Sequence, residues 1–175
     1  MSEQTNIAID VRNQKNLENL FPGGFRITRG RTSGYGCSAF VLNHFFPKRF
    51  SLYDTDPDIN NTFKDEGNNQ FKVVDEYEVS KAENVRHSEH FKKDAVIAYV
   101  DLTPIELFGR TVENKTVNHV GVIVEDPEQG LCLESKLNPQ NSPQIITFDL
   151  GDMLRYEQEA GTVTHIQILE AIKSK

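Results

Sequence analysis

The stretch Gly34-Tyr35-Gly36-Cys37-Ser38-Ala39-Phe40-Val41 decides how this chain folds, and its apolar run continues to Phe46. Two glycines flank an aromatic residue and permit a turn, so that Cys37 stands at the start of the run. Apolar side chains then recur at helical spacing until Pro47, which lacks an N–H and disfavours helix in the residue before it. The stretch predicts a helix from about Cys37 to Phe46, with the cysteine in its first turn.

Cys37 is the candidate nucleophile. A thiol in the first turn of a helix meets unpaired N–H groups and the positive end of the helix dipole, and both favour the thiolate. The structural alternative is that Cys37 is a small buried hydrophobe, as free cysteines often are. This stretch alone leaves both interpretations open.

Length and composition indicate a single domain. The chain has 175 residues, of which 37% are hydrophobic and 26% are charged, as in an ordinary globular protein. We expect one domain over 1–175 with its core at about 30–170. The net charge of -7 argues against a nucleic-acid partner, because no basic block could neutralise phosphates.

Other classes of protein are disfavoured by what the sequence lacks. No apolar run approaches the roughly 20 residues that a membrane span needs. Two cysteines are too few for a disulfide scaffold. The N-terminus lacks the basic-then-apolar order of a secretory signal. We therefore expect a protein that is cytoplasmic as synthesised, with a dedicated secretion system as the route of any export.

The second half of the chain changes to strand patterns. Apolar runs of strand length occupy five segments, at 95–100, 117–124, 131–135, 145–148 and 163–169. The connection between the second and third is short, which predicts an antiparallel hairpin of 118–124 with 130–135. The absence of long crossover helices predicts an α+β fold, with the Cys37 helix packed on an antiparallel sheet of about five strands.

His119 and Glu134 are the residues that the hairpin would bring near Cys37. His119 lies in a strand that is otherwise rich in β-branched residues, and Glu134 lies in the next apolar strand, where an unpaired carboxylate is costly. If the strands pair, Glu134 can approach His119 and orient its ring. A thiol, an imidazole and a carboxylate then form a nucleophile, a base and an orienting group.

These residues resemble a known family. Gly36-Cys37-Ser38-Ala39-Phe40-Val41 resembles the Asp-Cys-Ser-Gly-Leu-Val motif of NlpC-type papain-like cysteine peptidases, and Asn118-His119-Val120-Gly121 resembles their His-Val-Gly-Ile strand. Leu133-Glu134-Ser135 stands where the family has its third polar residue. Gly36 and Ala39 depart from the pattern, and the Cys-to-His separation indicates insertions at about 51–90 and 101–116. Such insertions would border the cleft and influence substrate choice.

The resemblance implies a fold, an activity and a substrate class. It implies a papain-like domain that hydrolyses amide bonds of peptidoglycan stem peptides through an acyl-thioester on Cys37. A compact version without an export signal resembles the amidase effectors of type VI secretion, for which an immunity or inhibitor protein is a further expected partner. Deamidases and acyltransferases acting on other substrates share the scaffold. A catalytically silent binding module on the same fold is the alternative from another class.

Three further predictions concern the oxyanion donors, the second cysteine and metal binding. The backbone N–H of Cys37 is one expected oxyanion donor, and the Tyr35 hydroxyl is a second candidate or else a packing residue. Cys132 shares strand parity with Glu134 and is either a resolving thiol or a buried small residue. No His/Cys spacing suits zinc, so we expect neither a metal nor another cofactor.

Overall fold

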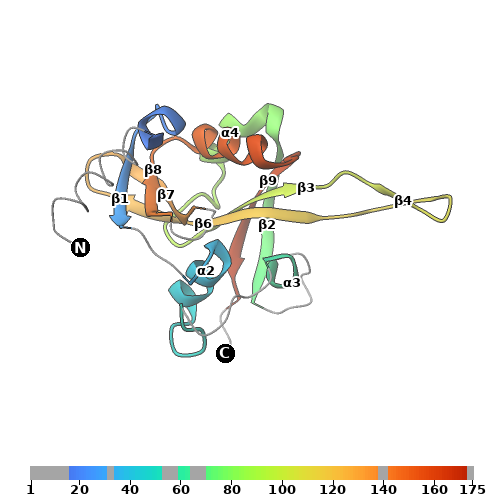
Figure 1. The fold of residues 1–175 in the computed structure, drawn as a ribbon, viewed down its shortest axis with the longest axis horizontal. Coiled ribbons are helices and arrows are strands. Elements are labelled where there is room, and N and C mark those ends of the chain that lie inside the picture. The colour runs from blue at the N-terminus through green and yellow to red at the C-terminus, as the bar shows by residue number, and fades with distance from the viewer. Residues whose placement is uncertain (1–15, 31–33, 53–58, 64–69, 138–141, 173–175) are drawn as a thin grey trace.

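The structure, a computed structural model, describes residues 16–30, 34–52, 59–63, 70–137 and 142–172 (Figure 1). After a helical turn at residues 16–20, it contains three labelled α-helices, one 3-10 helix and nine strands in those ranges. The helices are α2 Cys37–Phe45, α3 Ile59–Phe63, η2 Val79–His87 (3-10) and α4 Leu150–Ala160. The strands are β1 Phe25–Arg29, β2 Phe71–Glu78, β3 Val96–Asp101, β4 Ile105–Leu107, β5 Arg110–Val112, β6 Thr116–Asp126, β7 Gly130–Lys136, β8 Gln144–Thr147 and β9 His165–Ala171.

Seven strands form one antiparallel sheet in the order β1-β8-β7-β6-β3-β9-β2. This confirms the α+β class, and the predicted hairpin is present as β6 paired with β7. The expected number of strands was too low, because of the outermost strands β1 is largely exposed and β2 is only partly buried. Edge strands of this kind lack the continuous apolar run by which the central strands are recognised.

Helices cover both faces of the sheet (Figure 1). α2 packs on one face and α4 on the other, and we call these the α2 face and the α4 face. The α2 face buries Cys37, Val41, Val96, Ala98, Val100, Val117, Val120 and Val122, among others. The α4 face buries Ile97, Tyr99, Ile123, Leu133, Ile145, Met153 and Ile166, among others. The two cores alternate along each central strand, as the two-residue period of a strand requires.

Hydrogen bonds at Gly36 and Asp149 mark the starts of α2 and α4. Gly36 is extended and precedes α2, and its carbonyl accepts the N–H of Phe40 at 3.1 Å. The predicted end at Phe46 is correct to within one residue, since α2 ends at Phe45. α4 begins after Asp149, whose side chain accepts the N–H of Gly151 at 2.7 Å, a typical N-cap.

The two expected insertions have different structures. Part of 51–90 forms β2, which is the last strand of the sheet, with β6, β3 and β9 between it and β7; residues 53–58 and 64–69 lie outside the described residues. The polar connection 101–116 contains the antiparallel pair β4–β5, an arm that projects from the body (Figure 1). Among the described residues, no helix is long and apolar enough to cross a membrane.

Candidate functional site

Cys37 is the first residue of α2 and is 4% exposed. Burial, and to a smaller extent the negative charge of Glu157, raises the pKa of its thiol to about 11. Backbone hydrogen bonds from Val120, Ser38 and Cys37 itself act in the opposite direction. The helix start therefore supplies N–H groups to the sulfur, as the sequence predicts. Burial outweighs them, so the resting group is the neutral thiol.

The N–H of Val120 reaches the sulfur because β6 and β7 stop pairing nearby. The paired residues of β6 and β7 run from Asp126↔Gly130 to Val122↔Glu134, and Val120 lies beyond the last pair. Gly121 marks the close approach of the strands, since a Cβ there would come within 2.7 Å of Leu133. The start of α2 thus packs against the point at which the hairpin ladder ends.

A chain of buried polar side chains lies on the same face as Cys37. The Tyr35 hydroxyl donates to Oε1 of Gln144 at 3.1 Å, and the Gln144 amide donates to Oε1 of Glu134. Burial raises the pKa of Glu134, while the Gln144 hydrogen bond and the charge of His44 lower it. Because each polar group has a partner, the chain is retained in an otherwise apolar layer.

Lys136 completes this cluster. It pairs across the sheet with Gln144 and is 0% exposed. Its Nζ donates to the carbonyl of Leu137 at 3.0 Å and lies 5.8 Å from the centroid of the Tyr35 ring. Burial lowers the pKa of the Lys136 ammonium, and the charge of Cys37 opposes that shift. The amine and the thiol therefore interact electrostatically within one buried layer.

His119 lies on the other face of the sheet. Its Cα partner is Tyr99, whose hydroxyl donates to the carbonyl of Leu150 in α4. Its Nδ1 lies 3.2 Å from Oε1 of Glu157, also in α4. The expectation that Glu134 orients His119 is therefore corrected: Glu157 is the neighbouring carboxylate. The physical reason is the register of the hairpin: Glu134 pairs with Val122, and His119 is three positions from Val122, so regular strand alternation puts the two side chains on opposite faces.

The His119–Glu157 pair is buried but poorly satisfied. Neither ring nitrogen of His119, nor Oε1 of Glu157, makes a hydrogen bond of favourable geometry with the described residues. Burial lowers the pKa of His119 to about 3 and raises that of Glu157 to about 7. Both groups thus favour their neutral forms at or below neutral pH, in a layer that cannot solvate charge.

The structure brings together Tyr35, Cys37 and Glu134 and separates His119 from them. The sequence analysis did not single out three residues of these buried layers, namely Lys136, Gln144 and Glu157, although each stands in a recognisable pattern. Lys136 follows Glu134 by two positions and so shares its strand face. Gln144 begins an apolar strand, and Glu157 continues the inward helical series Leu150, Met153 and Leu154.

Cys132 is the second free cysteine and is fully buried. It shares strand parity with Glu134, as predicted, and its thiol contacts the carbonyl of Gly130 at 3.4 Å. Among the described residues, no group of three His, Cys, Asp or Glu side chains could hold a metal ion. In comparisons with protein-family models, curated proteins and solved structures, nothing matches this chain.

Proposed function

We propose that the protein is a cysteine-dependent hydrolase of amide bonds with a papain-like arrangement, in which Cys37 is the nucleophile. The observation that carries this proposal is the position of the thiol. Cys37 opens a helix that packs on an antiparallel sheet, its sulfur accepts backbone N–H groups, and a buried amine shares its layer. A nucleophile with a nearby base is the minimum that acyl transfer requires.

The proton acceptor that we propose is Lys136, a buried amine whose pKa responds to the charge of Cys37. Its lowered pKa increases the fraction of neutral amine, and a neutral amine can take the proton from Sγ as sulfur attacks the carbonyl carbon. The resulting ammonium returns that proton to the leaving nitrogen as the C–N bond breaks, which leaves a thioester on Cys37. Water then attacks the thioester, gives one proton to regenerate the thiol, and releases the acid.

The neighbouring polar groups position this chemistry. The backbone N–H of Cys37, which is directed at its own sulfur in the resting protein, is the donor proposed for the developing oxyanion once sulfur attacks. Tyr35 is tied to Gln144, so its proposed role is to hold the layer in place rather than to donate to the substrate. Glu134 accepts a hydrogen bond from the other end of Gln144, and it shares its strand face with Lys136 two positions along.

The proposed substrate class follows from the resemblance of the Cys37 and His119 motifs to NlpC-type enzymes. We propose a peptide or isopeptide bond of peptidoglycan stem peptides, with an immunity or inhibitor protein as a further partner. In this view the protein acts as an exported bacterial effector. Incubation of the purified protein with muropeptides, followed by mass analysis of the products, tests this directly. Cleaved fragments are expected, and a full set of unaltered muropeptides would reject this substrate class.

A catalytically silent binding module is the second candidate. It is favoured by one observation, the pKa of about 11 for the Cys37 thiol, which leaves little thiolate at neutral pH. Such a module would bind muropeptides in a calorimetric titration without releasing products. Alkylation of Cys37 by iodoacetamide would then follow the titration of a lone buried thiol and would be unchanged by Lys136→Met.

A further inference from the structure

A cavity of about 780 Å³ lies at the end of α2 opposite Cys37, next to the edge formed by β2 and β9. This volume is within the range of sites for small molecules. Its apolar lining comes from Phe45, Phe46, Ala171 and Ile172, all of which are partly buried. The cavity therefore offers an apolar surface that can cover part of a ligand.

Charged residues surround this apolar lining. Lys72, Lys92 and Lys93 line the cavity together with Asp94 and Glu170. Each of these carboxylates has a cationic or imidazole neighbour: Nζ of Lys92 lies 3.1 Å from Glu170, and Nε2 of His44 lies 3.0 Å from Asp94. Within the described ranges, no carboxylate forms an ion pair with Lys72 or Lys93. The lining thus carries three lysines against two carboxylates, one net positive charge in a chain of net charge -7.

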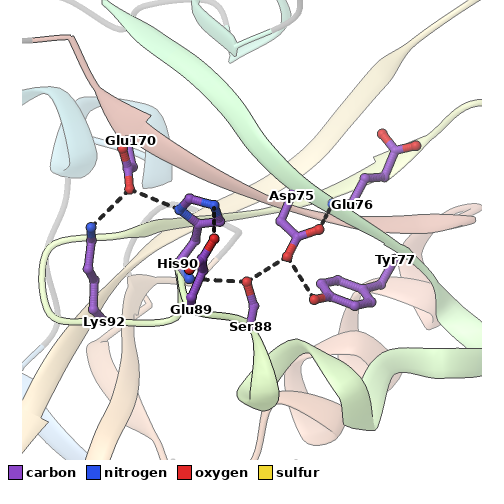
Figure 2. A network of polar contacts seen from close by, with 8 residues as sticks. All are labelled: Asp75, Glu76, Tyr77, Ser88, Glu89, His90, Lys92 and Glu170. Atoms are coloured by element: carbon purple, nitrogen blue, oxygen red, sulfur yellow. Dashed lines mark hydrogen bonds and ion pairs between the residues drawn. The ribbon is translucent and has the colours of Figure 1, made fainter.

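A polar network fixes the wall that carries Glu170 (Figure 2). Glu170 contacts Nδ1 of His90 at 3.3 Å in addition to Lys92. The backbone N–H of His90 donates to Ser88, whose hydroxyl donates to Asp75 of β2 at 2.5 Å. These contacts connect β9, β2 and the segment after η2, so the wall is held in place without a ligand.

We propose that this cavity binds a small organic anion, namely a carboxylate or sulfonate group attached to an apolar chain or ring. The anionic group would lie between Lys72 and Lys93, and the apolar body would lie against Phe45, Phe46 and Ile172. The carbonyl end of α2 opposes an anion weakly, so both lysines are required. The site is independent of the proposed amide hydrolysis, because Cys37 is at the far end of a helix about 12 Å long.

The test uses the fluorescence of 1-anilinonaphthalene-8-sulfonate, an anionic aromatic probe, titrated into the full-length protein. We expect saturable binding at one site. The double variant Lys72→Met/Lys93→Met should weaken it about five- to tenfold, since two exposed charge contacts contribute about 1 kcal/mol or somewhat more together. Lys81→Met, which removes an exposed lysine from η2, is the matched control and should leave the affinity unchanged.

Two further measurements separate charge recognition from general apolar binding. Decanoate should displace the probe at a lower concentration than decanol in the wild type, and this difference should disappear in the double variant. The uncharged N-phenyl-1-naphthylamine should bind the wild type and the double variant equally. Equal binding of the sulfonate probe to the double variant and to Lys81→Met would overturn the proposal, as would the absence of a saturable site in a protein with unchanged circular dichroism.

Discussion

The titratable side chains on the two faces of the sheet differ in their hydrogen bonding. On the α2 face, Tyr35, Gln144 and Glu134 form a continuous hydrogen-bonded chain in the layer that holds Cys37 and Lys136. On the α4 face, His119 and Glu157 lie 3.2 Å apart without favourable hydrogen bonds. A satisfied network can hold reactive groups at low cost, whereas an unsatisfied buried pair costs stability. We infer that the α2 face carries the chemistry, and that the α4 pair makes stability depend on pH.

The two cysteines provide the largest expected contrast. Cys37→Ala should lower amide hydrolysis by at least about 10³-fold, because the nucleophile is lost. Cys132→Ala, the other buried thiol with the same strand parity as Glu134, should keep turnover within a few-fold of the wild type. Product release from muropeptides and circular dichroism of both variants measure this. Residual hydrolysis by a pure Cys37→Ala protein would contradict the assignment of Cys37 as the nucleophile.

The second contrast compares the bases on the two faces. Lys136→Met should lower turnover by about 10²–10⁴-fold, the usual contribution of positioned proton transfer, while His119→Gln should retain it. Turnover and melting temperature of both variants separate chemistry from folding. If His119→Gln is inactive but stably folded, the imidazole has the role that the sequence motif predicts, and β6 must present its other face to Cys37 during the reaction.

The third prediction concerns stability on the α4 face. The folded-state pKa of Glu157, about 7, is raised above the ordinary value of 4.5. Its contribution to stability is therefore complete below about pH 4.5 and is lost as the pH rises through 7. Glu157→Gln removes that loss, so it should stabilise the protein at pH 8 by on the order of 2 kcal/mol and far less at pH 5.

Urea unfolding of the wild type and Glu157→Gln at the two pH values measures this difference. Glu159→Gln removes an exposed carboxylate from the same helix and is the matched control. The low pKa of His119 acts in the opposite pH direction, since the unfolded imidazole binds a proton below about pH 6.5 that the folded one rejects. His119 is present in all three proteins, and because it lies 3.2 Å from Glu157, the difference measures the pair rather than Glu157 alone. A constant difference at both pH values would contradict the account.

The smallest effect is expected for Glu134→Gln. The new side chain keeps an oxygen that can accept from the Gln144 amide, so the polar chain remains intact and only the charge beside Lys136 is lost. Turnover should fall by less than about tenfold, well below the loss from Lys136→Met. Activity as low as that of Lys136→Met would mean that the Glu134 carboxylate takes part in proton transfer.

Much of the fold was predictable from local patterns. The helix at Cys37 and the hairpin of β6 with β7 follow from apolar periodicity and the length of one connection. β1 and β2 are less evident because edge strands are only partly buried. The β4–β5 arm was missed because its strands are three residues long and its apolar side chains stay exposed, up to Phe108 at the tip.

The site was predictable in part, and the missing part has one physical cause. Strand parity placed Glu134 and Cys132 correctly, and it would also have placed Lys136. His119 was misplaced because the pairing register was unknown: Glu134 pairs with Val122, so the alternation of β6 puts His119 on the opposite face, and a shift of one residue would have put it on the same face. Residues 117–124 alone do not specify this register, which comes from the pairing of β6 with β7.

The central claim is that the sulfur of Cys37 forms a covalent acyl intermediate with an amide substrate. The most direct measurement mixes the protein with muropeptides, quenches the reaction with acid within one turnover, and maps the modified peptide by mass spectrometry. We expect an acyl mass on the peptide that contains Cys37, released by hydroxylamine and absent from the Cys132 peptide. Product formation without any adduct on Cys37, in a reaction that Cys37→Ala also completes, would contradict the account.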